Sequence, residues 1–123
     1  MIKLHLGCGP NVKIDYINID KYVSEVFAQE FNVKRLDILN LPFADYTAGE
    51  ILAEHLVEHL LFSEEQEFFR ECFRLLVSGR SLKIEVPDIG WVFSSFLSAP
   101  DNFIDFYEVG SKDHCFGNGP LTI

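Results

Sequence analysis

IKLHLGCGPN, residues 2–11, runs from a short apolar segment into a turn that carries Gly7 and Gly9. Glycine has no Cβ, so it suits positions where the backbone turns sharply or where a ligand approaches the main chain. A G-x-G loop that holds a nucleotide needs both properties, but an isolated G-x-G is equally compatible with a plain turn after a strand. The meaning of this loop therefore depends on what the rest of the chain places beside it.

Short apolar segments alternate with amphipathic ones along the chain. The segments with strand character are residues 2–6, 16–19, 33–36, 50–53 and 82–86. Pro87 stops the last of them, because a proline cannot extend an interior ladder. Helical segments between strands imply parallel pairing through right-handed crossovers. We therefore expect an α/β fold, a Rossmann-like, mostly parallel sheet of about five strands flanked by helices.

Two helices are expected from the spacing of apolar residues. The first lies within residues 23–31, with an apolar face made of Val23, Val26, Phe27 and Phe31. The second begins at Ser63, a favourable N-cap with Gln66 three residues later, and ends near Gly79. Its expected buried stripe consists of Phe69, Cys72, Phe73 and Leu76.

Acidic residues follow the second and third expected strands. Asp20 closes the second strand, where its carboxylate could accept hydrogen bonds from both hydroxyls of a ribose. Asp37 closes the third, where it could accept from an adenine amino group while the Ile38 N–H faces a ring nitrogen. Each acid alone is as well explained by a turn or a solvated cap. Together with the Gly7–Gly9 loop they predict an adenosine pocket at the carboxyl ends of the strands.

Composition excludes several classes of protein. The 123 residues favour one domain, and the net charge of -9 disfavours binding to nucleic acid, because phosphate contacts need Lys and Arg. The three cysteines lie far apart without metal-ligand spacing, which is typical of a reducing compartment. No segment approaches the roughly 20 apolar residues that span a bilayer. We expect a cytoplasmic protein that binds neither membrane nor nucleic acid.

Five segments together resemble the class I S-adenosylmethionine-dependent methyltransferases, especially small ones that occur beside sugar-modifying genes. They are KLHLGCGPN, INID, LDILNLPF, EHLVEHL and LKIEVPD, and the resemblance covers residues 2–88. By this likeness the loop Leu6, Gly7, Cys8 and Gly9 would hold the methionine part of the cofactor. Asp20 would bind the ribose, and Asp37 with Ile38 the adenine.

The same resemblance places Ala53, Glu54 and His55 along the methyl-transfer side. A methyl group on a sulfonium is already activated, so the enzyme mainly has to position a nucleophile and exclude water. For a hydroxyl or amine acceptor, His55 is the candidate general base. Glu54 could complement the sulfonium charge. A small-molecule acceptor, with a sugar as one option, follows only from the likeness.

The chain also departs from that family. Only a short segment separates Gly7 from the second strand, so the usual intervening helix must be reduced to a turn. A third glycine is missing too, which counts against a nicotinamide dehydrogenase that needs G-x-G-x-x-G and a full helix for its pyrophosphate. Material for the family's last two strands is absent. A non-catalytic binding module, or a piece of a longer enzyme, is therefore the alternative.

Residues 89–123 form a tail rich in aromatic residues. The tail contains Trp91, Phe93, Phe96, Phe103, Phe106, Tyr107 and Phe116. So many aromatic side chains need a partner. We expect the tail either to cover the substrate pocket or to build a homodimer, within a single domain whose cofactor-binding core is residues 1–88.

A competing motif is HLVEH, residues 55–59, which matches the H-x-x-E-H spacing of an inverted zinc-peptidase helix. On a helix, His55 and His59 would share a face and could ligate zinc, with Glu58 as base. His55 is expected in the strand exit, before any helix begins, and no third ligand is evident. We therefore expect no metal site and keep a zinc hydrolase as the less favoured alternative.

Overall fold

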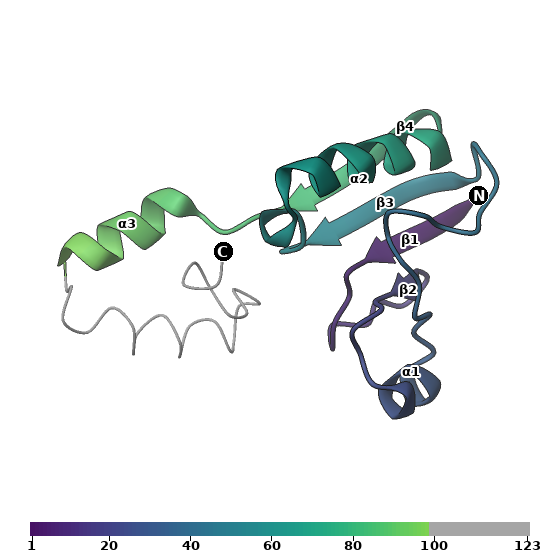
Figure 1. Ribbon diagram of the computed structural model, residues 1–123, viewed down its shortest axis with the longest axis horizontal. Coiled ribbons are helices and arrows are strands. Elements are labelled where there is room, and N and C mark those ends of the chain that lie inside the picture. Colours follow the sequence, from purple (N-terminus) through teal and green to yellow (C-terminus); the bar gives the residue numbers. More distant parts are fainter. Residues whose placement is uncertain (99–123) are drawn as a thin grey trace. The chain divides into compact units, whose positions relative to one another are not determined.

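The computed structural model describes residues 1–98, including all side chains except those of Ile89, Val92, Ser95 and Phe96 (Figure 1). The chain divides into two compact units, Met1–Glu85 and Val86–Ile123. We describe each unit by itself. The expected tail residues Phe103, Phe106, Tyr107 and Phe116 lie outside the described residues.

The first unit is built on a parallel sheet of four strands. These are β1 (Ile2–Leu6), β2 (Ile17–Ile19), β3 (Ala48–Glu54) and β4 (Leu76–Glu85), in the order β2-β1-β3-β4. Leu6 lies opposite Ile19 on one side and Ala53 on the other. The carboxyl ends of β1, β2 and β3 therefore lie side by side at one edge of the sheet. This arrangement confirms the Rossmann-like α/β fold that the sequence predicts.

The third expected strand, at 33–36, is reduced to one bridge, between Lys34 and Ile19. The Lys34 N–H donates to Asn18 O at 2.8 Å, and the Asp20 N–H donates to Lys34 O at 3.1 Å. Val33 is buried, but Lys34 and Arg35 are exposed and polar. Leu36 is partly buried against the core, but it does not extend the pairing with β2 beyond the Lys34 bridge. The prediction of a strand here was therefore right in position and wrong in extent.

The helix between β2 and the 33–36 segment is α1 (Glu25–Phe31). The Ser24 hydroxyl accepts the Phe27 N–H at 3.1 Å and begins the helix. No residue of α1 is buried, and Val26 is 74% exposed. The apolar face expected for this helix is therefore not part of the core. Apolar periodicity predicted the helix correctly but not what packs against it.

The long helix is α2 (Phe62–Leu75), which lies along β3 and β4 (Figure 1). It begins two residues before the expected segment, where the Glu64 carboxylate accepts the Leu61 N–H at 2.9 Å, so Ser63 is not its N-cap. Its buried residues are Phe68, Glu71, Cys72 and Leu75. Of the expected stripe only Cys72 is among them. The helix ends at Leu75 rather than near Gly79, because β4 starts at the next residue.

The hydrophobic core lies between α2 and one face of the sheet. Leu4, Leu6, Ile51 and Ala53 come from β1 and β3, and all are fully buried. Side chains alternate between the two faces of a strand, so His5, Glu50 and Glu54 belong to the opposite face. That second face is polar: Lys83 Nζ lies 2.5 Å from Glu50 Oε1, and the Tyr16 hydroxyl donates to Glu50 Oε2.

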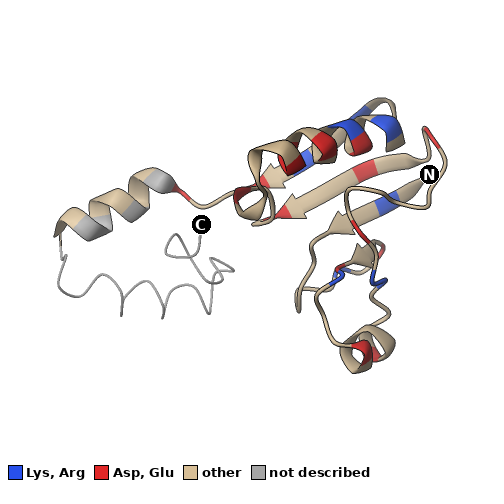
Figure 2. Ribbon diagram, viewed as in Figure 1, with Lys and Arg blue, Asp and Glu red and all other residues tan. Residues whose placement is uncertain are grey.

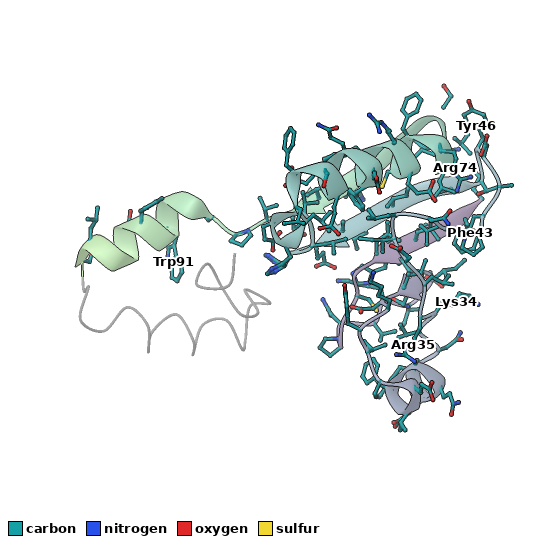
Figure 3. All side chains as sticks on the ribbon, in the orientation of Figure 1. Lys34, Arg35, Phe43, Tyr46, Arg74 and Trp91 are labelled. Carbon is teal, nitrogen blue, oxygen red and sulfur yellow. The ribbon has the colours of Figure 1, made fainter. Side chains whose placement is uncertain are left out.

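A partly buried ion pair, between Glu71 and Arg74, fixes the loop that enters β3. Arg74 Nε lies 2.7 Å from Glu71 Oε1, and Glu71 Oε2 accepts the Leu41 N–H. The Arg74 guanidinium also donates to Phe43 O and to Asp45 Oδ1, both at 2.8 Å. Figure 3 shows Arg74 and Phe43 close together near the end of α2. Arg74 and the Leu41 N–H hold the pKa of Glu71 below its ordinary value.

The second unit contains α3 (Ile89–Ser98). The Asp88 carboxylate accepts the Trp91 N–H at 3.0 Å and so caps the start of this helix. Trp91 and Phe93, the first aromatic residues of the expected tail, are both exposed. None of the helices in residues 1–98 has the length and apolar character that crossing a bilayer requires.

Candidate functional site

The glycine loop after β1 is held directly by β2. The Gly7 and Cys8 N–H groups both donate to Ile19 O, at 2.8 and 3.2 Å. Gly7 and Gly9 have φ angles of 67° and 50°, a left-handed conformation that glycine adopts without strain. Leu6 is fully buried in the strand that delivers this loop. The loop is therefore a fixed extension of the sheet edge.

Asp20, the residue after β2, connects its own strand to this loop. Its Oδ2 accepts the Gly9 N–H at 2.8 Å, and its Oδ1 accepts the Tyr22 N–H at 2.8 Å. Each carboxylate oxygen has two lone pairs and so retains acceptor capacity. The structure thus brings Gly7, Gly9 and Asp20 together, as the sequence predicts.

Cys8 belongs to the loop but is not a reactive thiol. It is 3% exposed, and burial, with a smaller contribution from Asp20, raises its pKa to about 11. At neutral pH the side chain is a neutral thiol, which is a poor nucleophile. Its contribution to the site is to anchor the loop between Gly7 and Gly9.

Asp37 and Ile38 follow the Lys34 bridge. The Asp37 carboxylate is exposed and accepts the Leu39 N–H at 3.0 Å, and Asp37 O accepts the Asn40 N–H at 3.1 Å. Ile38 is partly buried and packs against the core. Asp37 therefore forms a turn beyond the segment that pairs with β2.

Ala53, Glu54 and His55 end β3 and enter the next loop. Ala53 is fully buried beside Leu6. Glu54 Oε1 lies 3.1 Å from Lys13 Nζ and 3.4 Å from His5 Nε2, so it faces the polar side of the sheet. His55 has a φ of 52°, and its N–H donates to Glu85 O at 2.8 Å. The main chain of His55 is thereby fastened to the end of β4.

The HLVEH segment does not form the helix that a zinc peptidase needs. His55 is left-handed and precedes η1, a 3-10 turn that covers only Val57–His59. Glu58 Oε1 lies 3.9 Å from His55 Nδ1 and 3.6 Å from His59 Nε2. Within residues 1–98 no group of three or more His, Cys, Asp or Glu side chains is arranged to hold a metal ion.

His5 and Asn18 form a buried polar pair that the sequence alone does not reveal. The Asn18 amide NH₂ donates to Lys13 O and Tyr16 O, at 2.9 and 3.2 Å. Its Oδ1 therefore faces the Lys13 N–H at 2.9 Å and His5 Nδ1 at 3.0 Å. His5 and Asn18 are opposite each other in the β1–β2 register, a signal that strand alignment could have supplied.

The ionisation of His5 is set mainly by burial. The side chain is 1% exposed, and desolvation lowers its pKa from 6.5, while Asn18 and Glu54 act in the opposite direction. Lys13 adds to the lowering. Because Asn18 accepts from Nδ1, the neutral ring carries its proton on Nδ1. This network fixes the segment between Gly9 and β2 without the helix that is missing there.

Residues 4–82, well over half of the chain, match the methyltransferase domain family. No curated protein sequence matches the chain. Among solved structures, a SAM-dependent methyltransferase from Archaeoglobus fulgidus aligns with a TM-score of 0.60 and 23% identity, over 80% of this chain and 51% of that chain.

A second structure is similar. It is described as an S-adenosyl-L-methionine-dependent methyltransferase, from Methanococcus maripaludis, and aligns with a TM-score of 0.56 and 17% identity. The alignment covers 87% of this chain and 59% of that one. The present chain therefore spans between half and two thirds of the length of these two structures, which share its fold. On the match over residues 4–82, the chain belongs to the methyltransferase domain family.

Proposed function

We propose that this chain binds S-adenosylmethionine at the carboxyl ends of β1 and β2 and supports transfer of its methyl group to a small-molecule acceptor. The observation that carries the proposal is the Asp20 carboxylate, which holds the Gly9 N–H at 2.8 Å and keeps lone pairs for a diol. A ribose presents such a pair of hydroxyls.

The loop after β1 leaves room for a ligand beside Gly9. A Cβ built on Gly9 would meet nothing within 4 Å, whereas one on Gly7 would lie 2.8 Å from Leu56 Cδ1. Gly9 therefore borders open space, and Gly7 is packed against the loop after β3. The methionine part of the cofactor would be held by the loop of Leu6, Gly7, Cys8 and Gly9. Asp20 would bind the ribose, and Asp37 and Ile38 the adenine. Ala53 would line the site beside them.

The segment after Gly9 favours a sulfonium cofactor over a dinucleotide. Residues 10–16 contain only turns and irregular structure, so no helix N-terminus follows the loop. A pyrophosphate is ordinarily bound by such a terminus, whereas S-adenosylmethionine has no phosphate. Negative charge around the site is also compatible with a cationic cofactor: Asp20, Asp37 and Glu54 carry carboxylates at or beyond the strand ends.

For the chemistry we propose His55 as general base and Glu54 as the acid that complements the sulfonium. When bound, the cofactor supplies an activated methyl group, so the protein has to position the acceptor and receive its proton. His55 enters the loop after β3 with its main chain fixed by Glu85 O. Glu58, near both His55 and His59, would act as a positioning residue for the His55 ring.

Calorimetry tests the binding step. Micromolar affinity for S-adenosylmethionine and for S-adenosylhomocysteine, with no binding of NAD, is the expected result. Absence of binding at millimolar ligand would overturn the cofactor site. The alternative, a methyltransferase-like module without turnover, is motivated by the share of the relatives' length that the chain spans. That alternative predicts binding with no methyl transfer to a panel of hydroxyl and amine acceptors, including sugars.

We further propose a cytoplasmic location with no nucleic-acid or membrane partner.

A further inference from the structure

Glu54 is a mostly buried carboxylate at the carboxyl end of β3, beside the proposed cofactor site. Figure 2 shows acidic residues along β3 and at its end, and the last of them is Glu54. Its side chain is 14% exposed. Its Oε1 atom is buried and, within residues 1–98, accepts no hydrogen bond of good geometry. A carboxylate in such surroundings depends on a nearby positive charge.

Lys13 supplies that charge. Its Nζ lies 3.1 Å from Glu54 Oε1. His5 Nε2 lies 3.4 Å from the same oxygen, but the neutral ring carries its proton on Nδ1 and cannot donate from Nε2. Burial holds the pKa of His5 below 6.5, so the ring is neutral at neutral pH. Among the described residues, Lys13 therefore balances the charge of Glu54 at neutral pH.

The ammonium of Lys13 can leave Glu54 without a change in the fold. The main chain of Lys13 is fixed, because its N–H donates to Asn18 Oδ1 and its carbonyl accepts from Asn18 Nδ2, both at 2.9 Å. Its side chain is 36% exposed. An ion pair that is open to solvent and lacks an aligned hydrogen bond is weak. The side chain can therefore turn into solvent while its loop stays in place.

This ion pair lies beside the loop that would hold the methionine part of the cofactor. Ala53 is opposite Leu6 in the β1–β3 register, so the main chain of Glu54 begins beside Gly7. The sulfur of the methionine part is positively charged before methyl transfer and neutral afterwards. Before transfer, the carboxylate of Glu54 would attract this sulfur and the ammonium of Lys13 would repel it.

We propose that Lys13 is a specificity-determining residue that pairs with Glu54 when no sulfonium is present and gives way when S-adenosylmethionine binds. The inference rests on the proposed cofactor site and on Glu54 as the acid that faces the sulfonium. Lys13 would weaken binding of the cationic cofactor but not of S-adenosylhomocysteine, whose sulfur is neutral. After transfer, the returning ammonium would again balance Glu54.

Calorimetry with S-adenosylmethionine and S-adenosylhomocysteine tests this inference. Lys13→Met should tighten S-adenosylmethionine binding by at least about threefold, because a repulsive unit charge is removed, and should leave S-adenosylhomocysteine within about twofold. Lys13→Gln should give the same change in the affinity ratio. Lys3→Met is the matched control, because Lys3 also lies near a carboxylate, 4.0 Å from Glu50 Oε2, but near the start of β1. Thermal unfolding checks that each variant is folded.

A double-mutant cycle tests whether Lys13 acts through Glu54. In the Glu54→Gln background, Lys13→Met should change the affinity ratio less, since the ammonium then has no carboxylate to hold it beside the sulfur. If Lys13→Met weakened both ligands equally, Lys13 would bind a group that the two share, such as the carboxylate. That result, or an unchanged ratio, would overturn the inference and leave the cofactor site standing. A wild type that binds neither ligand at millimolar concentration would remove both.

Discussion

The Asp20 carboxylate accepts the Gly9 N–H at 2.8 Å, and this one contact joins the end of β2 to the loop after β1. In the proposed site, the side chain that would bind the ribose also fixes the loop that would hold the methionine part. Loop conformation and cofactor recognition therefore depend on the same residue.

Replacing Asp20 with Asn should weaken S-adenosylmethionine binding by about 1.5 to 3 kcal/mol, the scale of hydrogen bonds to a charged group. The amide oxygen can still accept the Gly9 N–H, but the NH₂ group cannot accept the Tyr22 N–H, and the side chain offers one acceptor oxygen and no charge to a diol. Asp15→Asn is the matched control, because Asp15 is an exposed turn acid with a φ of 69° that Asn tolerates. Calorimetry measures both, and equal affinities for the two variants would show that the ribose lies elsewhere.

Replacing Gly7 and Gly9 with alanine, one at a time, should show which of the two glycines matters for stability and which for cofactor binding. Both positions have positive φ, so each alanine costs about 1 kcal/mol of strain. Gly9→Ala adds a methyl in open space and should mainly reduce cofactor affinity. Gly7→Ala places a methyl 2.8 Å from Leu56 Cδ1 and should lower the free energy of unfolding further. Leu56→Ala should recover part of that additional loss, and urea unfolding of the double variant checks the coupling.

His5 should be observed by NMR as the Nδ1-protonated tautomer, because Asn18 Oδ1 accepts from that nitrogen. Its pKa lies below 6.5, so the unfolded state binds more protons just below that pH and stability falls as the pH drops through this window. Lys13→Met should raise the pKa of His5, and Glu54→Gln should lower it. Titration of the imidazole nitrogens measures both. Shifts of the opposite sign would contradict the assigned network.

The Glu71–Arg74 pair should contribute to stability above pH 4.5. The folded state holds the pKa of Glu71 below 4.5, so its contribution is complete above that pH and is lost as the pH falls through the lower, folded value. Glu71→Gln should cost about 1 to 3 kcal/mol at neutral pH and much less in acid. Glu30→Gln, at an exposed acid of α1, is the control. Urea unfolding at neutral pH and in acid measures the free energy of unfolding of each variant. If Glu71→Gln lost the same amount of stability at both, the ionised pair would be excluded as the cause.

Strand positions were predictable where apolar side chains recur at every second residue, as Ile2, Leu4 and Leu6 do in β1. β1 matches its expected range, and Gly7, Gly9 and Asp20 meet as expected because parallel strands end at a common edge. The segment around Lys34 was overestimated because its polar residues allow only one bridge. The His5–Asn18 pair was missed because a lone histidine in a strand gives no signal until the register of its neighbour is known.

Helix α2 shows why periodicity alone could not identify the core. Phe69 and Phe73 repeat at helical spacing as well as Phe68, Cys72 and Leu75 do, so the sequence contains two apolar faces. Only the position of the sheet decides which face is buried. The start of α2 was misplaced for a related reason: Ser63 suits an N-cap, but Glu64 satisfies the Leu61 N–H instead.

The hydrogen bond from the His55 N–H to Glu85 O sets a truncation limit for anyone who wishes to express the first unit alone. A polypeptide that stops before Glu85 would leave the His55 amide without its acceptor and would release the loop that follows β3. The shortest version suitable for crystallisation or isotope labelling therefore retains the last residue of the edge strand.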